Sequence, residues 1–198
     1  RAHIPLQMFP RLSDYVGRGV ITTATYEARA FGIGSAMGLM KAARLCPQAI
    51  LLPADFKEYR KYSRAFKQII LQHVPVMENR GIDEVYLDFT EAPDGQLQGG
   101  RVLAERVQEH IFRATGLTCS IGIAPNKLIA KMCSEFNKPR GISVIFESDL
   151  QTRIWPLPCS KIGGVGPKTN AHLEAHGIRT IAELAACERP WLMREFGE

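Results

Sequence analysis

The spacing of apolar side chains predicts short strands alternating with amphipathic helices along most of the chain. Between residues 55 and 73, large apolar residues return every three or four positions, which indicates a helix with one buried face and one basic face. The same spacing predicts a helix over 100–115, and Pro125-Asn126 opens another that runs to about Asn137. The apolar positions are Phe56, Tyr59, Tyr62, Phe66, Ile69 and Ile70 in the first helix, and Val102, Leu103, Val107 and Ile111 in the second.

Four segments rich in β-branched and aromatic residues are predicted as strands, over 76–80, 83–90, 117–124 and 141–146. With the helices, they give the order helix, strand, strand, helix, strand, helix, strand. This order resembles a split βαβ sheet covered by helices on one face, which predicts an α+β fold class. Such a fold hosts many functions, so the function must come from particular residues.

The chain changes character at both ends. Near the start, Gly19–Tyr26 reads as a strand, and 49–53 reads as a short buried strand. Between them a helix is predicted, with Ser35 near its start and Pro47 past its end. Beyond residue 155 short helices dominate, with Gly177 predicted as a left-handed helix C-cap and Thr180 as the N-cap of the next helix. The C-terminal segment is therefore predicted to be a separate helical unit.

Composition places the protein among ordinary soluble proteins. No apolar run approaches the roughly 18 residues of a membrane span, and the first residues do not read as a signal peptide, so we expect a cytoplasmic protein without membrane contact. The five cysteines are widely spaced and form no CxxC pair, which predicts reduced, mostly buried thiols. The net charge of +5 is concentrated in residues 1–47 and 126–140, a distribution that suits a polyanionic partner or an ordinary solvated basic face.

Asp83-Glu84 stands out because acids are depleted in strands, whereas the following Val85, Tyr86 and Leu87 favour them. A break of this kind often marks a site where stability is given up for function. A hairpin turn in solvent, made plausible by Gly81, would also tolerate two charges. Taken alone, the pair leaves both interpretations open.

"GGVGPKT", from Gly163 to Thr169, combines a glycine turn with a proline suited to the first position of a helix. Pro167 stands where a P-loop needs glycine followed directly by lysine, and no strand precedes the segment. The segment instead resembles a helix-hairpin-helix, a module that grips DNA backbone phosphates without reading sequence.

Three further stretches remain ambiguous taken one at a time. Lys127, Lys131 and Lys138 are predicted to share one face of a helix whose other side, with Leu128, Ile129, Met132 and Phe136, is buried. "TYEAR", which holds Tyr26 and Arg29, reads as a turn from strand to helix. His172 and His176, four residues apart, offer two metal ligands, but the sequence shows no third ligand.

Taken together, "ITTATYEARAFGIGSAM", "DFKEYRKYSRAF", "GIDEVYLDFT", "SIGIAPNKLIAKMCSEFNKPRG" and "IGGVGPKTNAHLEAHGI" are far more specific than any one of them. In order and spacing they resemble the Y-family translesion DNA polymerases, and most of all their bacterial DNA polymerase IV (DinB) branch. The resemblance covers roughly residues 16–190. It implies fingers over 1–55, a ferredoxin-like palm over 56–147 and a thumb with the helix-hairpin-helix over 148–198.

The resemblance also implies roles for individual residues. Asp83 and Glu84 would be catalytic ligands of two Mg²⁺ ions, which clamp the attacking and leaving oxygens of a phosphoryl transfer. The incoming deoxynucleoside triphosphate would be held by Thr23, Tyr26, Arg29 and Lys138, because Arg and Lys suit phosphate charge. Primer-template DNA would contact the helix-hairpin-helix at Gly164, Gly166, Lys168 and Thr169.

The sequence departs from the family pattern in two respects. Gly81 stands where the family usually has serine, which removes a hydroxyl but no metal ligand. The family's first palm strand, with a third metal-binding aspartate and an aromatic steric gate, has no counterpart in residues 1–18, and the little finger and clamp-binding tail are also absent. Residues 1–198 alone are therefore expected to be inactive, with any sliding-clamp contact made by regions outside this chain.

Three functions follow from these features. The first is a template-directed, damage-bypass DNA polymerase, a nucleotidyltransferase that extends a primer 3′ end. The alternative is a polymerase-like protein that binds DNA but has lost a metal-binding carboxylate and its chemistry. A nucleotidyl cyclase on a similar palm would explain the acidic hairpin but not the helix-hairpin-helix.

Overall fold

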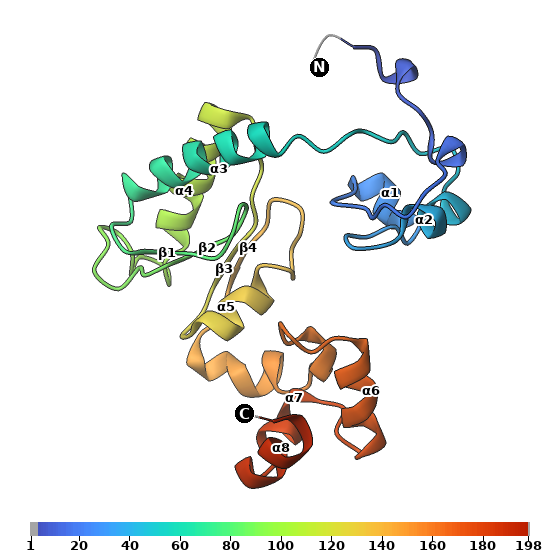
Figure 1. Ribbon diagram of the computed structural model, residues 1–198. Coiled ribbons are helices and arrows are strands. Elements are labelled where there is room, and N and C mark those ends of the chain that lie inside the picture. Colours follow the sequence, from blue (N-terminus) through green and yellow to red (C-terminus); the bar gives the residue numbers. More distant parts are fainter. Residues whose placement is uncertain (1–3, 198) are drawn as a thin grey trace. The chain divides into compact units, whose positions relative to one another are not determined.

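The computed structural model describes residues 4–197 of a chain that divides into two compact units, Arg1–Glu58 and Tyr59–Glu198 (Figure 1). It confirms the predicted α+β class. The helices are α1 (Tyr26–Ala30), α2 (Leu39–Leu45), α3 (Phe56–Leu71), α4 (Arg101–Thr115), α5 (Lys127–Cys133), α6 (Pro167–Ala175), α7 (Ile181–Ala185) and α8 (Arg189–Phe196). The strands are β1 (Met77–Asn79), β2 (Val85–Leu87), β3 (Ile121–Ile123) and β4 (Ile142–Val144). Short helical turns are η1 (Leu6–Met8), η2 (Leu12–Asp14), η3 (Glu147–Asp149), η4 (Leu150–Ile154) and η5 (Cys159–Lys161).

The first unit is built around a small core of six buried residues rather than around a sheet. Isolated antiparallel bridges, Arg11 to Ile50 and Val20 to Gly38, tie its loops together. The buried residues come from η2, α2 and the loops between the helices: Leu12, Ile21, Ile33, Leu39, Ala42 and Cys46.

Three predictions in this unit are wrong at the level of secondary structure. The expected strand over 19–26 pairs only at Val20, because Thr25 caps α1 by accepting a hydrogen bond from the Ala28 amide at 3.4 Å. The expected helix from Ser35 begins four residues later, since Ala36 adopts a left-handed φ of +63°. The expected buried strand over 49–53 forms one bridge, and Ile50 is exposed.

The four predicted strands of the second unit are present but shorter than expected, and they form two separate two-stranded sheets. β1 and β2 pair antiparallel, whereas β3 and β4 pair parallel. α4 packs against both β3 and β4. Its buried residues form one core with the C-terminal half of α3: Ile70, Val74, Ala92, Leu103, Val107 and Ile111.

Both long helices confirm their predicted periodicity, with one qualification. Leu103, Val107 and Ile111 of α4 are buried, and Ile70 near the end of α3 packs with them. The aromatic residues at the start of α3, such as Phe56, are instead largely exposed.

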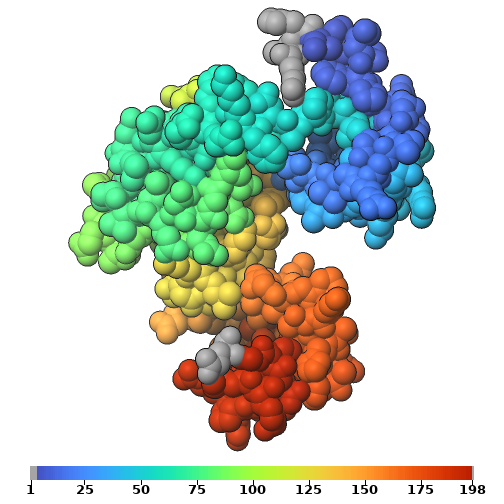
Figure 2. Space-filling model, in the orientation of Figure 1, coloured from blue at the N-terminus to red at the C-terminus, as the bar shows by residue number. Residues whose placement is uncertain are grey.

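α5 packs closely on β3 because the facing residue is a glycine. A Cβ at Gly122 would lie 2.1 Å from the Ala130 carbonyl oxygen and 2.5 Å from the Ser134 nitrogen. The helix ends at Cys133, so the predicted continuation to Asn137 is wrong, and residues 134–140 are turns. The buried side of α5 then joins a core shared with the C-terminal helices. On the surface, the yellow segment that includes α5 borders the orange segment that follows it (Figure 2). That core holds Ile129, Met132, Cys133, Ile145, Ile154 and Ile181.

The C-terminal helices confirm the predicted caps. Pro167 begins α6, and Gly177 follows it with φ of +79°. Thr180 caps α7 by accepting a hydrogen bond from the Glu183 amide at 3.2 Å. The small core beneath these helices contains Cys159, Leu173 and Ile178. All five cysteines of the chain are free thiols, as predicted.

Candidate nucleic-acid and metal site

A tight hairpin turn between β1 and β2 presents the predicted acids. Glu78 of β1 lies opposite Tyr86 of β2. The Lys67 ammonium group of α3 donates to the Asn79 side-chain oxygen at 2.9 Å and to the Gly81 carbonyl at 2.5 Å. Gly81 has φ of +149°, which side chains rarely adopt, so a residue with a Cβ would strain the turn. The turn is thus fixed by α3 and by glycine.

Asp83 and Glu84 lie in this turn rather than inside a strand, because β2 begins at Val85. Both residues are exposed. The Arg80 amide donates to the Glu84 carbonyl at 3.1 Å and closes the turn. The expected strand over 83–90 is therefore shorter. Its two acids lie in the turn, where charged side chains destabilise the sheet least.

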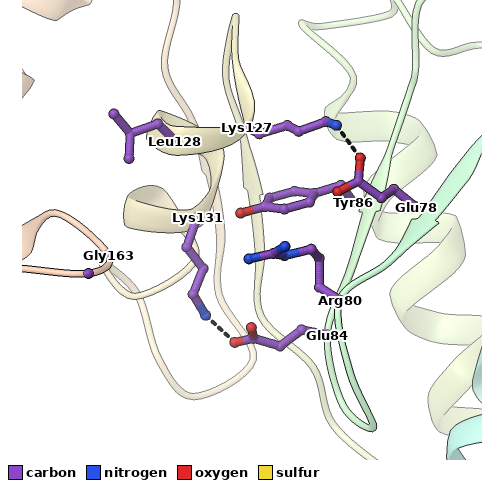
Figure 3. A pocket seen from close by; sticks show the side chains of 9 residues that line it. Glu78, Arg80, Glu84, Tyr86, Lys127, Leu128, Lys131 and Gly163 are labelled. Carbon is purple, nitrogen blue, oxygen red and sulfur yellow. Dashed lines mark hydrogen bonds and ion pairs between the residues drawn. The ribbon is translucent and has the colours of Figure 1, made fainter. Parts of the chain in front are cut away.

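A cavity of about 470 Å³ opens beside the turn. β1, β2 and the turn form one wall, α5 forms another, and the glycine hairpin before α6 forms the third (Figure 3). Glu84 lines this cavity, whereas Asp83 does not. The lining residues are Glu78, Arg80, Glu84, Tyr86, Lys127, Leu128, Lys131, Gly163 and Gly164.

Two lysines of α5 reach across the cavity to the hairpin. Lys127 pairs with Glu78, and Lys131 pairs with Glu84, as the dashed lines of Figure 3 show. Lys131 also lies 3.9 Å from the carboxylate of Glu135. These contacts confirm that Lys127 and Lys131 share a face of the helix, as their spacing of four residues predicts.

The cavity carries a surplus of positive charge. Three of its lining residues are cationic and two are acidic. Within residues 4–197, Arg80 has no acidic partner, and its guanidinium stands over the Tyr86 ring at 5.8 Å from the centroid. The Lys127 ammonium group lies at the same distance from that ring. An aromatic ring between two cations, with one cation unpaired, suits a ligand that brings negative charge.

The pKa of Lys131 reflects its two opposing surroundings. Partial burial lowers the pKa. The hydrogen bond and charge of Glu84, together with the charges of Glu135 and Tyr86, raise the pKa by more than burial lowers it. The net pKa lies above the ordinary value, so Lys131 is a cation throughout the physiological range. The negative charge of Glu84 is therefore already neutralised by Lys131 in the absence of a metal ion.

The donor atoms of the turn fit a hard divalent cation. Asp83 and Glu84 offer carboxylate oxygens, which Mg²⁺ prefers. In the described part of the chain, no side chain forms a hydrogen bond or ion pair with the Asp83 carboxylate. Glu84 Oε1 accepts from Lys131, so a cation at this turn would compete with that ammonium group for the carboxylate.

The predicted nucleotide-binding residues are divided between the two units. Thr23, Tyr26 and Arg29 belong to the first unit and are exposed there. The Arg29 guanidinium stands over the Tyr26 ring at 5.5 Å, and its Nε donates to the Ala24 carbonyl at 3.0 Å. Tyr26 and Arg29 therefore form one local surface, beside which Thr23 precedes the helix.

Lys138 belongs to the second unit and is not on the helical face predicted for it. Because α5 ends at Cys133, Lys138 lies in the turns that follow. Its ammonium group pairs with Glu135 at 2.6 Å. Lys131 lies near the same carboxylate. Lys131 and Lys138 are therefore linked through Glu135, and not by a shared helical face as predicted. Leu128, predicted to be buried, is exposed at the cavity.

The predicted DNA-binding hairpin is open to solvent. Gly164 has φ of +98°, and a Cβ at Gly163, Gly164 or Gly166 would meet nothing within 4 Å. Lys168, in the first turn of α6, is exposed, and Thr169 beside it is partly exposed. Two of the hairpin's glycines line the same cavity as Glu84, which joins two motifs that the sequence analysis treated separately.

The sequence analysis missed Glu78, Arg80 and Tyr86 as members of this site. Residues two apart along a strand point to the same face, so positions 78 and 80, and 84 and 86, belong together once the hairpin is known. That alternation was the signal that would have found them. The ion pairs between α5 and the hairpin join residues that are 49 and 47 positions apart in the sequence. Contacts over such separations leave no pattern in the local sequence that could have predicted them.

Comparison with known proteins identifies the class. The model of the impB/mucB/samB family matches residues 10–135, and a helix-hairpin-helix model of the same group matches residues 147–178. The chain belongs to the impB/mucB/samB family. The resemblance to DinB-type Y-family polymerases is thereby confirmed.

The individual relatives narrow the class further. A DNA polymerase IV of Shewanella woodyi is 43% identical over 182 residues, and one of Clostridium kluyveri is 39% identical over 180 residues; each match covers 91% of this chain. The crystal structure of DinB from Sulfolobus solfataricus is similar with a TM-score of 0.83 at 30% identity, over 93% of this chain and 54% of that one. An insertion ternary complex of Dbh DNA polymerase matches with the same TM-score at 29% identity and the same two coverages.

The chain spans about half the length of these curated relatives, 50% of the Shewanella protein and 45% of the Clostridium protein. Among the described residues, no helix has both the length and the apolar character that a membrane crossing requires.

Proposed function

We propose that this chain forms the catalytic part of a template-directed DNA polymerase of the translesion type, which adds deoxynucleotides to a primer 3′ end. The observation that carries the proposal is the position of Glu84: an acid on a fixed turn, lining a cavity with surplus positive charge beside a helix-hairpin-helix. Relatives named DNA polymerase IV and a structure titled as an insertion ternary complex support the same activity.

Asp83 and Glu84 are proposed to hold two Mg²⁺ ions, and Glu84 would serve the one that activates the primer 3′-hydroxyl. When bound, such ions lower the pKa of the attacking hydroxyl and stabilise charge on the leaving oxygen. The chain's own contribution is to fix both carboxylates on one short turn, anchored by Lys67 and closed by the Arg80 amide.

Lys131 has two successive partners in this scheme. Without metal it neutralises Glu84. If Glu84 held a metal ion, the Lys131 ammonium group would be available to a phosphate of the DNA backbone. Each partner would be acidic, so neither Glu84 nor Lys131 would be left as an uncompensated charge, while the cavity keeps its positive surplus.

Within the first unit, Thr23, Tyr26 and Arg29 are proposed as nucleotide-binding residues, and within the second unit Lys138 is proposed as one. Arg29 provides a planar guanidinium that binds phosphate oxygens in pairs, and Lys138 provides a point charge. Glu135 holds Lys138 until the triphosphate arrives, by the same exchange that operates at Lys131.

The helix-hairpin-helix is proposed to bind the DNA backbone through Gly164, Gly166, Lys168 and Thr169. The glycines leave room for a phosphate to approach the main chain, and the first amides of α6 point toward the hairpin. Since Gly164 also lines the cavity, one strand would run from the hairpin toward Glu84.

Primer extension by the full-length protein that carries this chain tests the function directly. The assay contains Mg²⁺, a primer-template and all four deoxynucleotides, and a parallel titration measures DNA affinity. Template-dependent extension is the expected result. DNA binding without extension would refute the polymerase and support the alternative, a polymerase-like DNA-binding protein without chemistry.

A further inference from the structure

His172 of α6 and His176, the C-cap residue of that helix, meet a glutamate of α8 in the helical segment. His172 and His176 are one helical turn apart, and the His172 Nε2 lies 3.5 Å from the Glu195 Oε2. One ligand atom from each of the three residues lies within 4.8 Å of the others. α8 therefore supplies the third ligand that the spacing of the histidines left missing.

These distances are close to those of a tetrahedral zinc site. With bonds of about 2.0 to 2.1 Å, two ligand atoms of a tetrahedral Zn²⁺ lie about 3.4 Å apart. The His172 to Glu195 distance already meets this value. Small side-chain rotations bring in the His176 ring, whose centroid is 4.8 Å from that of His172. Both histidines are exposed to solvent.

A hydrogen bond to the main chain prepares His176 to bind metal. Its Nδ1 lies 2.9 Å from the His172 carbonyl oxygen. Because a carbonyl oxygen only accepts, Nδ1 carries the proton and donates it, which leaves the lone pair of Nε2 available. Histidines that bind metals commonly donate their second nitrogen in this way, since the bond fixes both the tautomer and the ring.

α8 is attached weakly by other means. It contains no buried residue, and its Met193 and Phe196 are exposed. Trp191 contacts the small C-terminal core, and its ring lies 5.3 Å from that of His176, while the Phe196 ring lies 5.1 Å from that of His172. Glu195 has one other charged neighbour, the Arg194 Nε at 3.5 Å. A ligand that joins α6 to α8 would supply an attachment that apolar burial does not.

We propose that His172, His176 and Glu195 bind a Zn²⁺ ion, with water as the fourth ligand, and that the ion fastens α8 to α6. Two imidazoles and one carboxylate suit zinc, whereas Mg²⁺ prefers oxygen ligands alone. The three ligands are residues other than those of the acidic turn and its cavity.

Calorimetric titration with ZnCl₂ of the tag-free chain, first stripped with a chelator, tests the site. We expect one site per chain with a Kd of about 1 μM or tighter. Each of His172→Gln, His176→Gln and Glu195→Gln should weaken it at least about tenfold. The matched control is His110→Gln, because His73 and His110 form another pair, with ring nitrogens 2.7 Å apart, but without a third ligand.

Hydrogen exchange separates a zinc site from a simple ion pair. Zinc should slow exchange of the α8 amides in the unsubstituted chain and in His110→Gln, but not in Glu195→Gln. Loss of binding in His110→Gln with retention in Glu195→Gln would place the metal elsewhere and overturn the proposal. Absence of binding up to millimolar zinc would overturn it as well, leaving only the contact between His172 and Glu195.

Discussion

At the scale of single residues, the site is defined by exchangeable pairs. Glu84 is held by Lys131 and Glu78 by Lys127, while Arg80 lacks an acidic partner in the described part of the chain. The acids were predictable because they are out of place before a strand. Their partners were not, because the lysines lie in a distant segment and their spacing fits an ordinary solvated face equally well.

The substitution Lys131→Met should make metal binding at the turn easier. Glu84 would no longer be paired with a cation, and exposed ion pairs of this kind contribute about 0.2 to 1 kcal/mol, so Mn²⁺ affinity should rise by a factor of about 1.4 to 5. Electron paramagnetic resonance of free Mn²⁺, without DNA, measures the change. Lys127→Met is the control, since Lys127 pairs with Glu78. An equal gain in both variants would contradict the exchange of partners.

Cys133 should be the least reactive thiol of the second unit. It is fully buried, and burial raises its pKa from 9.0 to about 11 against the opposing charge of Arg153. At pH 8, iodoacetamide should modify Cys187, which is partly exposed, and spare Cys133. Peptide mass analysis reads the result, and rapid modification of Cys133 in the folded protein would refute it.

The same shift has a consequence for stability. The folded chain retains the Cys133 proton at a pH where the unfolded chain has released it. The contribution of this thiol to stability is therefore complete below about pH 9 and is lost as the pH rises toward 11. Cys133→Ala should flatten the decline of the unfolding free energy over that interval, as urea titrations at several pH values would record.

At the scale of elements, hydrophobic periodicity predicted α3 and α4, because their spacing reflects burial on one face, and β-branched and aromatic content predicted all four strands of the second unit. It failed in the first unit, where capping and a left-handed residue decide the backbone: Thr25 ends the apparent strand and Ala36 delays α2. It also overextended α5, whose last predicted turn is replaced by the turns that carry Lys138.

Gly122→Ala should destabilise the second unit by about 1 to 3 kcal/mol, because the added methyl group would overlap the backbone of α5. The displaced helix carries Lys127 and Lys131, so DNA binding should weaken as well. Gly163→Ala is the stability control, since its methyl group would meet nothing within 4 Å. Chemical denaturation of both variants measures the difference. Equal stability would mean that α5 does not pack as described.

The hairpin before α6 should bind DNA through phosphates alone. Affinity should fall steeply with salt and vary little with base sequence. Lys168→Gln should reduce the slope of log K against log salt by about 1, because one phosphate contact is lost. Fluorescence anisotropy across a salt series measures this slope. An unchanged slope, or a strong preference for one sequence, would remove the hairpin from the DNA interface.

At the scale of the whole molecule, the order of the motifs along the sequence was enough to identify the family, because five stretches in order are more specific than any single one. The site itself required the fold. Only in three dimensions do the turn of 80–84, α5 and the glycine hairpin enclose one cavity. The division into fingers, palm and thumb stays a prediction, and a single core joins residues on both sides of the expected boundary at 147.

The central claim is that Glu84 takes part in chemistry, whereas Glu78, the other acid of the same cavity, holds only Lys127. Single-turnover incorporation of one deoxynucleotide by the full-length protein, with DNA affinity measured in parallel, compares Glu84→Gln with Glu78→Gln. We predict that Glu84→Gln lowers the rate at least about a thousandfold with nearly unchanged DNA affinity. Glu78→Gln should lower it no more than about tenfold. Near-normal incorporation by Glu84→Gln, or equal losses in both variants, would contradict the account.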